Sequence, residues 1–333
     1  MRLENLLLSV CGAASLALVL GSAAIIPTGA VAHEDDLHCA AVIASVAEAG
    51  FADEVAVECE SGQAVLTSYT YPDHDLMTGI VGTNEQIPVP ANAYAAPIPL
   101  QPVLGTTPQT RDAALGVAVN GVPIYDYTGG GEMSIADLSD HQAQNDTLLT
   151  QQLDVCGGHA GRGDDYHYHV KPVCMIAQMK NAGDDAIIGW AYDGFPIYGD
   201  NNPDGTPIVA PVLDDCNGQP DGTFGYRYHT STDAPYIVQC LMGGVANMEQ
   251  LPRVAPLTPA VGGRGMEPGR PPRGGVDGLT FTQDASGLRS MDYSYEGEAY
   301  YMRYTPSQTP NCYTYETRTV TNGGDIATGE YCR

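Results

Sequence analysis

Three of the chain's eight histidines lie within eleven residues, close to a pair of cysteines. His159 follows two glycines, and the other two histidines occur in the run Tyr166-His167-Tyr168-His169. Side chains alternate across a β-strand, so His167 and His169 would share one face, with Cβ atoms roughly 6.5–7 Å apart. Two imidazoles at that spacing can bind one metal ion, with bonds of about 2.0–2.1 Å. A bend at the glycines would bring His159 over the same face.

Three neutral imidazoles with an open coordination position suit zinc or copper and can activate a bound water. The sequence therefore predicts a transition-metal site with His159, His167 and His169 as ligands. The alternative interpretation is that these side chains only hydrogen-bond backbone carbonyls and carboxylates in a polar core. His229 and His74 are further candidates, which would contribute ligands from other parts of the chain. The motifs G-x-S-x-G, P-loop and H-E-x-x-H are absent from the sequence.

A second candidate cation site is the acidic turn 200–205. Asp200, Asn202 and Asp204 match the first half of a calcium-binding loop. Pro211 stands where such a loop needs its twelfth-position glutamate, so an EF-hand is excluded. A plain turn is the favoured interpretation, and calcium binding is the alternative.

The elements that must position the histidines occur twice in the sequence. Residues 116–125 return at 189–198 with six of ten positions identical, and residues 153–169 return 60 positions later at 213–229. Asn-Gly and Asp-Gly between β-rich runs indicate hairpins. We therefore predict a tandem repeat, about 112–180 and 185–245, packed with pseudo-twofold symmetry. The second copy has Gln219 and Arg227 in place of His159 and His167, so the first copy is expected to carry the site.

The N-terminal segment and the cysteines indicate export. Residues 1–32 combine Arg2, an apolar run and the cleavage pattern Ala30-Val31-Ala32, as in a secretory signal peptide. Eight of the nine cysteines follow this segment, an even number that predicts four disulfides in an exported protein. Pairing of nearest neighbours is the simplest of 105 connectivities, and it gives Cys39–Cys59, Cys156–Cys174, Cys216–Cys240 and Cys312–Cys332. A secreted, periplasmic or cell-surface location follows.

The charge of the chain restricts its partners. It has 14 basic and 40 acidic residues, a net charge of −26. Such a surface repels nucleic acid and anionic lipid and attracts cations. The apolar run within 1–32 is too short for a membrane span, so we expect none in the mature chain.

Composition and pattern predict a mainly β fold, α+β at the N-terminus, in which the duplicated unit is stapled by disulfides. Helical spacing over 37–49 predicts a helix that ends at Gly50, and Ser61-Gly62 indicates a turn between two strands. Prolines at high density exclude helices from 80–110. We divide the chain into a signal peptide over 1–32, a small α/β lead-in over 33–75, a domain with the repeat over 76–250, a Gly/Pro/Arg linker over 251–275 and a Tyr-rich β module over 276–333. Alternating tyrosines in this last module are expected to form a packed face, and a surface for a glycan or protein partner is the alternative.

The run from His159 to His169, followed by residues 193–199, resembles the YHYH-domain proteins. Shorter stretches at 72–74, 86–90 and 120–124 are similar to the pattern of the same family. The resemblance covers about residues 70–245 and excludes the module from 276. It implies an exported or surface protein of bacterial type, and it implies no reaction. Family members often carry histidine where this chain has Gln219 or Arg227, so one site rather than two is implied here.

We therefore expect an exported protein that binds a transition metal through the histidine cluster. Two other functions stay open: a metal-dependent extracellular hydrolase or oxidase that uses the same ligands, and a non-catalytic structural or adhesive surface module. An open cleft over the histidines would favour the enzyme. Closed four-coordination would favour a structural metal, and histidines bonded only to backbone would favour the surface module.

Overall fold

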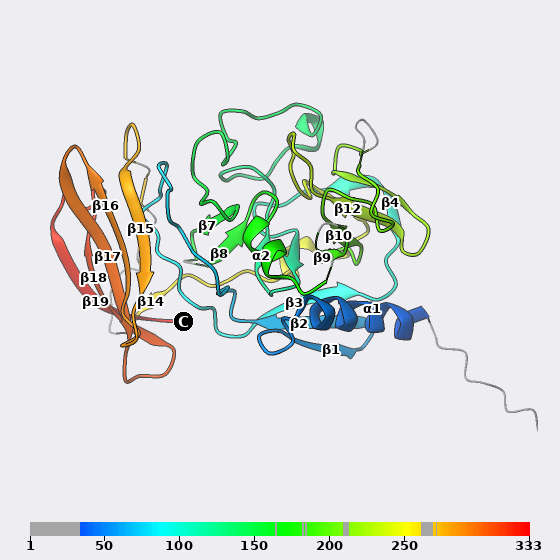
Figure 1. The fold of residues 1–333 in the computed structure, drawn as a ribbon, viewed down its shortest axis with the longest axis horizontal. Coiled ribbons are helices and arrows are strands. Elements are labelled where there is room, and N and C mark those ends of the chain that lie inside the picture. Colours follow the sequence, from blue (N-terminus) through cyan, green and yellow to red (C-terminus); the bar gives the residue numbers. More distant parts are fainter. Residues whose placement is uncertain are drawn as a thin grey trace, which may run out of the picture. The chain divides into compact units, whose positions relative to one another are not determined.

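The computed structural model describes residues 34–333, apart from 164, 182, 184, 209–212, 261–268 and 271. The predicted signal peptide and part of the predicted linker lie outside the described residues. These described residues belong to one compact unit. The described part is mainly β, as predicted (Figure 1). No helix in the described part combines the length and the apolar character that crossing a membrane requires.

The chain opens with α1 (Glu34–Ala49), a few residues earlier than the sequence predicts. Val42, Val46 and Ala49 recur at helical spacing and are buried, because they face the first sheet. Gly50 ends the helix at a φ of +96°, and Phe51 N donates to Val46 O at 3.0 Å. This is a Schellman arrangement, in which a glycine in the left-handed region satisfies carbonyls of the last turn.

The first sheet has three antiparallel strands in the order β1 (Ala56–Glu60), β2 (Gln63–Ser68) and β3 (Tyr94–Pro99). The turn between β1 and β2 is at Ser61-Gly62, as the sequence predicts. Between β2 and β3 the chain has neither helix nor strand, and Ile87 and Val89 there are fully buried. A further strand, β4 (Leu104–Gln109), pairs with β13 (Leu241–Gly243) in a small ribbon.

The central sheet has eight strands in the order β11-β12-β10-β9-β5-β6-β8-β7. The strands of its first half are β5 (Gly116–Ala118), β6 (Pro123–Ile124), β7 (Gly158–Ala160) and β8 (Tyr166–Tyr168). The strands of its second half are β9 (Ile187–Ala191), β10 (Pro196–Tyr198), β11 (Gly218–Asp221) and β12 (Gly225–His229). The two halves meet where β5 pairs with β9, and Val117 lies opposite Trp190 there.

The order of strands is the same in each half when it is followed outward from this centre. In the first half β6 pairs with β8 in parallel and β8 with β7 antiparallel. In the second half β10 pairs with β12 in parallel and β12 with β11 antiparallel. We infer from these equivalent pairings that the two halves are the two copies of the sequence repeat.

A carboxylate organises the same turn in each half, from a buried aspartate in the first half and an exposed one in the second. Asp154 accepts hydrogen bonds from the backbone N–H groups of Cys156 and Gly158 at 2.9 and 3.2 Å, and from the Tyr166 hydroxyl at 2.8 Å. Asp214 accepts from Cys216 and Gly218 at 2.9 and 3.1 Å, and from the Tyr226 hydroxyl at 2.7 Å. The first tyrosine of each Tyr-x-Tyr run is therefore a structural side chain, which ties β8 or β12 to the turn that precedes β7 or β11.

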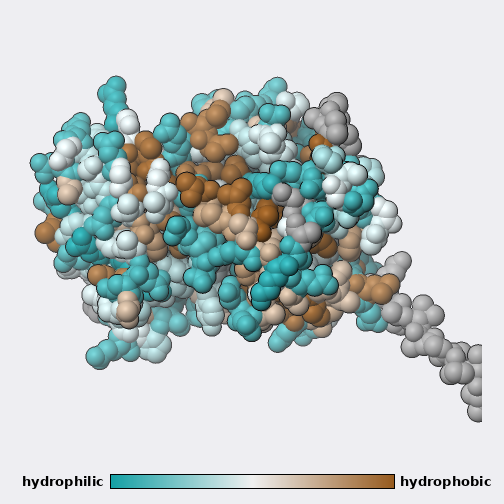
Figure 2. Space-filling model, viewed as in Figure 1, coloured by the Kyte–Doolittle hydropathy of each residue, from teal (hydrophilic) through white to brown (hydrophobic). Residues whose placement is uncertain are grey.

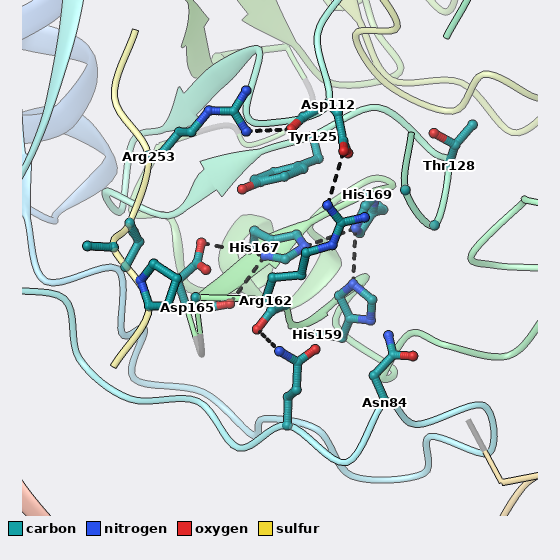
Figure 3. A pocket seen from close by; sticks show the side chains of 18 residues that line it. Asn84, Asp112, Tyr125, Thr128, His159, Arg162, Asp165, His167, His169 and Arg253 are labelled. Carbon is teal, nitrogen blue, oxygen red and sulfur yellow. Dashed lines mark hydrogen bonds and ion pairs between the residues drawn. The ribbon is translucent and has the colours of Figure 1, made fainter. Parts of the chain in front are cut away.

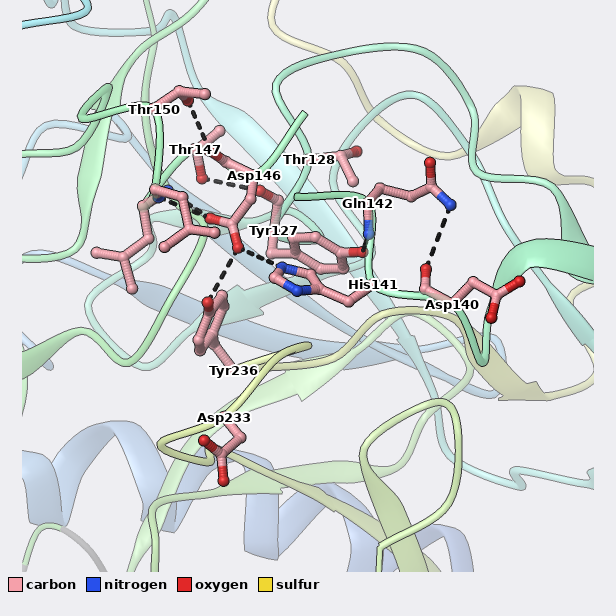
Figure 4. Close-up of polar contacts among 12 residues, drawn as sticks. Tyr127, Thr128, Asp140, His141, Gln142, Asp146, Thr147, Thr150, Asp233 and Tyr236 are labelled. Carbon is pink, nitrogen blue, oxygen red and sulfur yellow. Dashed lines mark hydrogen bonds and ion pairs between the residues drawn. The ribbon is translucent and has the colours of Figure 1, made fainter. Parts of the chain in front are cut away.

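Short helical segments and long loops complete the central region. The helical segments are η1 (Ile135–Asp137), α2 (Val173–Gln178) and η2 (Met248–Gln250). The long loop between β6 and β7 is held by Asp146, whose carboxylate accepts from His141 Nε2 at 2.7 Å and from the Tyr236 hydroxyl at 2.9 Å (Figure 4). Thr128, near the start of this loop, forms a β-bridge with Asp146.

The C-terminal sheet has six strands in the order β14-β19-β18-β17-β16-β15. Their bounds are β14 (Thr258–Pro259), β15 (Asp277–Gln283), β16 (Arg289–Tyr295), β17 (Glu298–Pro306), β18 (Cys312–Arg318) and β19 (Ile326–Cys332). Tyr293, Tyr304 and Tyr315 are buried, so they form a packed face. The Glu85 carboxylate joins this sheet to the extended segment before β3, because it accepts from the Tyr293 hydroxyl and from Val320 N and Thr321 N.

Four disulfides pair cysteines that are neighbours in sequence: Cys39–Cys59, Cys156–Cys174, Cys216–Cys240 and Cys312–Cys332. Cys156–Cys174 and Cys216–Cys240 hold equivalent places in the two halves of the central sheet, each beginning at the turn that leads into β7 or β11.

Hydrophilic residues cover much of the face in Figure 2, and hydrophobic residues gather in its middle, around α2.

Candidate metal centre

The predicted ligands His159, His167 and His169 come together at the edge of the central sheet. His159 lies on β7 directly opposite His167 on β8, and His169 follows β8 on the same face as His167. The Nε2 atoms of His167 and His169 are 3.0 Å apart, and those of His159 and His169 are 3.1 Å apart. Three ligand nitrogens around a tetrahedral ion with bonds of about 2.05 Å would be separated by about 3.3 Å. Two of the three separations are thus close to those between ligands of one ion, and the ligand atoms of the three histidines all lie within 4.8 Å of one another.

The partners of the other ring nitrogens determine where the protons are. His169 Nδ1 faces the carbonyl oxygen of Asp126, and His167 Nδ1 faces the carbonyl oxygen of Asp165 at 3.2 Å. A carbonyl only accepts, so these Nδ1 atoms carry the protons and each neutral ring has its lone pair at Nε2. His159 also has a backbone hydrogen bond, at Gln152. Lone pairs on neighbouring Nε2 atoms therefore face one another at 3.0 Å, which is unfavourable unless a cation lies between them.

Burial keeps two of these imidazoles, His159 and His169, from supplying that cation as a proton. It lowers the pKa of His159 to about 3, and the nearby His167 lowers it further than burial alone would. Burial also lowers the pKa of His169 well below its usual value, with added repulsion from His167 and His159. A metal ligand must be a neutral imidazole, so both rings are in the form that binds a metal at neutral pH.

The surroundings of His167 hold its ring in place on two sides. The Tyr125 ring stacks on it, with centroids 4.1 Å apart and planes 25° apart. Gly161 lies against its edge: a Cβ at position 161 would be 2.3 Å from His167 Cε1. The carbonyl partners of the three rings are the kind of outer contacts that orient metal-binding histidines. The sequence did not identify Tyr125, Gly161 or the backbone carbonyls as part of the site. Any residue can supply a backbone carbonyl, and a single glycine occurs for many structural reasons.

A cavity of about 430 Å³ opens over the three histidines. Figure 3 shows the imidazoles turned toward one another, with Arg162 extending beside them to Asp112. Arg253 also lines the cavity, and it donates to the backbone carbonyl oxygen of Asp112. Asp165 is buried at the cavity, and its Oδ2 lies 3.6 Å from His167 Nδ1 but has no hydrogen-bond partner among the described residues. The histidine nitrogens are thus reachable by a fourth ligand from the cavity.

Two of the candidate ligands, His74 and His229, are not part of this group of nitrogens. His74 Nε2 lies 2.8 Å from the Tyr168 hydroxyl, on the face of β8 opposite to His167 and His169. Its nearest sulfurs, those of Cys156 and Cys174, are joined in a disulfide and are not available as ligands. His229 lies in the second half of the sheet, with Nδ1 facing the Gly199 carbonyl at 3.0 Å.

The calcium candidate in the turn 200–205 gains no support from the contacts of its oxygens. Asp200 accepts from Lys171 Nζ at 2.7 Å and from the Thr230 hydroxyl. The Asn202 side-chain oxygen accepts from Arg227 at 2.7 Å, and Asp204 accepts from Thr206. These oxygens are therefore directed to separate donors, which is the pattern of a hydrogen-bonded turn.

Residues 95–208, about a third of the chain, match the family model described as "YHYH protein". This part of the chain is a YHYH domain, which confirms the family assignment made from the sequence. The matched residues include all three histidines of the group and end before β11 and β12. Searches among curated proteins and among solved structures gave no significant match.

Proposed function

We propose that this exported YHYH-domain protein binds one transition-metal ion through His159, His167 and His169. The observation that carries the proposal is the convergence of Nε2 lone pairs at 3.0 and 3.1 Å in a buried site. Such an arrangement is costly without a positive charge, and the depressed pKa values of His159 and His169 disfavour a proton there. Neutral imidazole is a good ligand for zinc and copper, so one of these is the expected ion.

The second half of the central sheet supports the same interpretation. The equivalent positions there hold Gln219, Arg227 and His229, and Arg227 Nε donates to His229 Nε2 at 2.9 Å. A cationic group thus meets the imidazole where the first half has only other imidazoles.

A metal-dependent extracellular hydrolase or oxidase is the second candidate function. The cavity over the three histidines favours it over a closed structural site, because a bound ion would keep an open coordination position. A zinc ion bound by three histidines would lower the pKa of a water in its open coordination position toward 7. The residues that would bind a substrate here are those of the cavity wall, among them Arg162, Asp165 and Gln86.

Export itself is supported by the four disulfides, which persist in oxidising compartments. N-terminal sequencing of the protein recovered from culture medium or periplasm tests this part of the proposal. The expected new N-terminus is His33, and an N-terminus at Met1 in the cytoplasmic fraction would contradict export.

Elemental analysis tests the metal proposal. Protein purified without a histidine tag should contain about one zinc or copper per chain, and His167→Ala should contain almost none. His141→Ala is the matched control, because His141 is a partly exposed histidine bound to Asp146 and outside the group. Equal metal content in wild type and His167→Ala would refute the proposed ligands.

A further inference from the structure

The second half of the central sheet places side chains of different chemistry at the positions of the proposed ligands. On β7 and β8, His159 lies opposite His167; on β11 and β12, Gln219 lies opposite Arg227. The third position is histidine in both halves, His169 and His229. Each of these two has Nδ1 turned to a backbone carbonyl, of Asp126 or Gly199, so each has its lone pair at Nε2.

The Nε2 lone pair of His229 is met by donors. Arg227 Nε lies 2.9 Å from it and Gln219 Nε2 lies 3.0 Å from it. In the first half, the same lone pair of His169 is met by two imidazole nitrogens at 3.0 and 3.1 Å. The two halves therefore differ in the charge beside this lone pair: the Arg227 guanidinium contacts His229, whereas imidazoles contact His169.

The remaining contacts of Arg227 keep its charge fixed at that point. Its Nη1 donates to the Asp221 carboxylate at 2.5 Å, and its Nη2 donates to Asn202 Oδ1 at 2.7 Å. The side chains of this ion pair are only 13% and 6% exposed. Removing only one partner of such an ion pair strongly destabilises the fold, because the other charge stays in the protein interior without its partner.

We propose that the Arg227 guanidinium is a built-in substitute for a metal ion, and that the second half of the sheet is a latent metal site. This inference rests on the metal site proposed for the first half. It explains why His229 has its Nε2 lone pair directed at the equivalent point of the second half, although the two residues beside it are not histidines. It also assigns Gln219 and Arg227 a common role, which is to satisfy that lone pair without an exogenous ion.

The equivalence specifies which substitutions would restore a site. Gln219→His and Arg227→His supply the two missing imidazoles. Asp221 occupies the place of Gly161, where a Cβ would be 2.3 Å from the His167 ring, so Asp221→Gly is needed to admit the new ring at 227. This third change also removes the carboxylate that would otherwise be left buried without its arginine.

Metal stoichiometry tests the proposal in the full-length mature chain. The triple variant Q219H/D221G/R227H and the control Q219A/D221G/R227A are dialysed against micromolar Zn²⁺, and zinc per chain is measured by mass spectrometry. We expect about two ions in the triple variant and about one in both the control and wild type. Addition of His167→Ala should reduce these values to about one in the triple variant and almost none in the control. Equal zinc content in the triple variant and its control would overturn the inference.

The two proposals fail in different ways in this experiment. Wild type without zinc would refute the site of the first half, whatever the variants bind. If the triple variant does not fold, as judged by fluorescence of Trp190, the double variants D221G/R227H and D221G/R227Q are compared instead, both with His167→Ala to remove the first site. The imidazoles at 227 and 229 of D221G/R227H should give a zinc-dependent rise in unfolding temperature that D221G/R227Q lacks, and identical responses would overturn the inference.

Discussion

Gly161→Ala should weaken metal binding although residue 161 contributes no ligand. The new Cβ would lie 2.3 Å from His167 Cε1, and carbon atoms in ordinary contact are about 3.5–4.0 Å apart. The imidazole must therefore move by about 1 Å or more, whereas metal sites hold their ligand distances to about ±0.2 Å. Loss of an outer partner of a ligand costs about 10–100-fold in affinity, and displacement of a ligand ring should cost at least as much. The backbone itself accommodates alanine, because the φ of Gly161 is not positive.

The assay is competition for zinc with a chromogenic chelator at neutral pH. Gly222→Ala is the matched control, because a Cβ at Gly222 has no atom within 4 Å. Unfolding in urea, followed by the fluorescence of Trp190, the only tryptophan, checks that each variant is folded. We expect a Kd at least about tenfold above wild type for Gly161→Ala and an unchanged Kd for the control. A folded Gly161→Ala protein with wild-type affinity would refute the placement of His167 as a ligand against Gly161.

Three further predictions concern stability. Glu85→Ala leaves two backbone N–H groups and the Tyr293 hydroxyl without their acceptor, so the free energy of unfolding in urea should fall by about 3 kcal/mol or more; a loss under 1 kcal/mol would contradict the proposed junction. Zinc at about 100 times its Kd should stabilise the fold by about 2.7 kcal/mol, so a chelator should lower Tm by about 4 °C in wild type and leave His167→Ala unchanged; equal shifts would contradict the site. Burial lowers the pKa of His229 to about 4 in the folded chain, below its unfolded value, so its contribution to stability is present above about pH 6.5 and is lost as pH falls toward 4. Wild type should therefore lose about 2 kcal/mol relative to His229→Gln between pH 7 and pH 5 in urea unfolding, and a constant difference would contradict the buried neutral ring.

Local patterns predicted the elements of the fold well. The helix before Gly50, the Ser61-Gly62 turn and the hairpins at Gly121 and Gly194 all depend on residues close in sequence, and each is present. A segment without helix over 80–110 was also expected, although the pairing of β3 with β2 and of β4 with β13 was not. Those pairings join residues far apart in sequence, and no local signal specifies the partner of a strand.

The sequence predicted the residue types of the candidate site, but not the direction in which each histidine points its Nε2. Alternation along β8 places His167 and His169 on one face, and the register with β7 then adds His159. The direction of each Nε2 depends on the carbonyls of Asp126 and Asp165, which no sequence pattern indicates. His74 remained a candidate ligand because nothing in the sequence indicates which face of β8 it contacts.

Anomalous diffraction from crystals of the protein, recorded at the absorption edges of zinc and copper, tests the central claim most directly. The account predicts one anomalous peak about 2.0–2.1 Å from Nε2 of each of His159, His167 and His169, and no peak at His229. Crystals soaked in zinc or copper that show no peak among these three nitrogens, or show the ion bound by other residues, would contradict it.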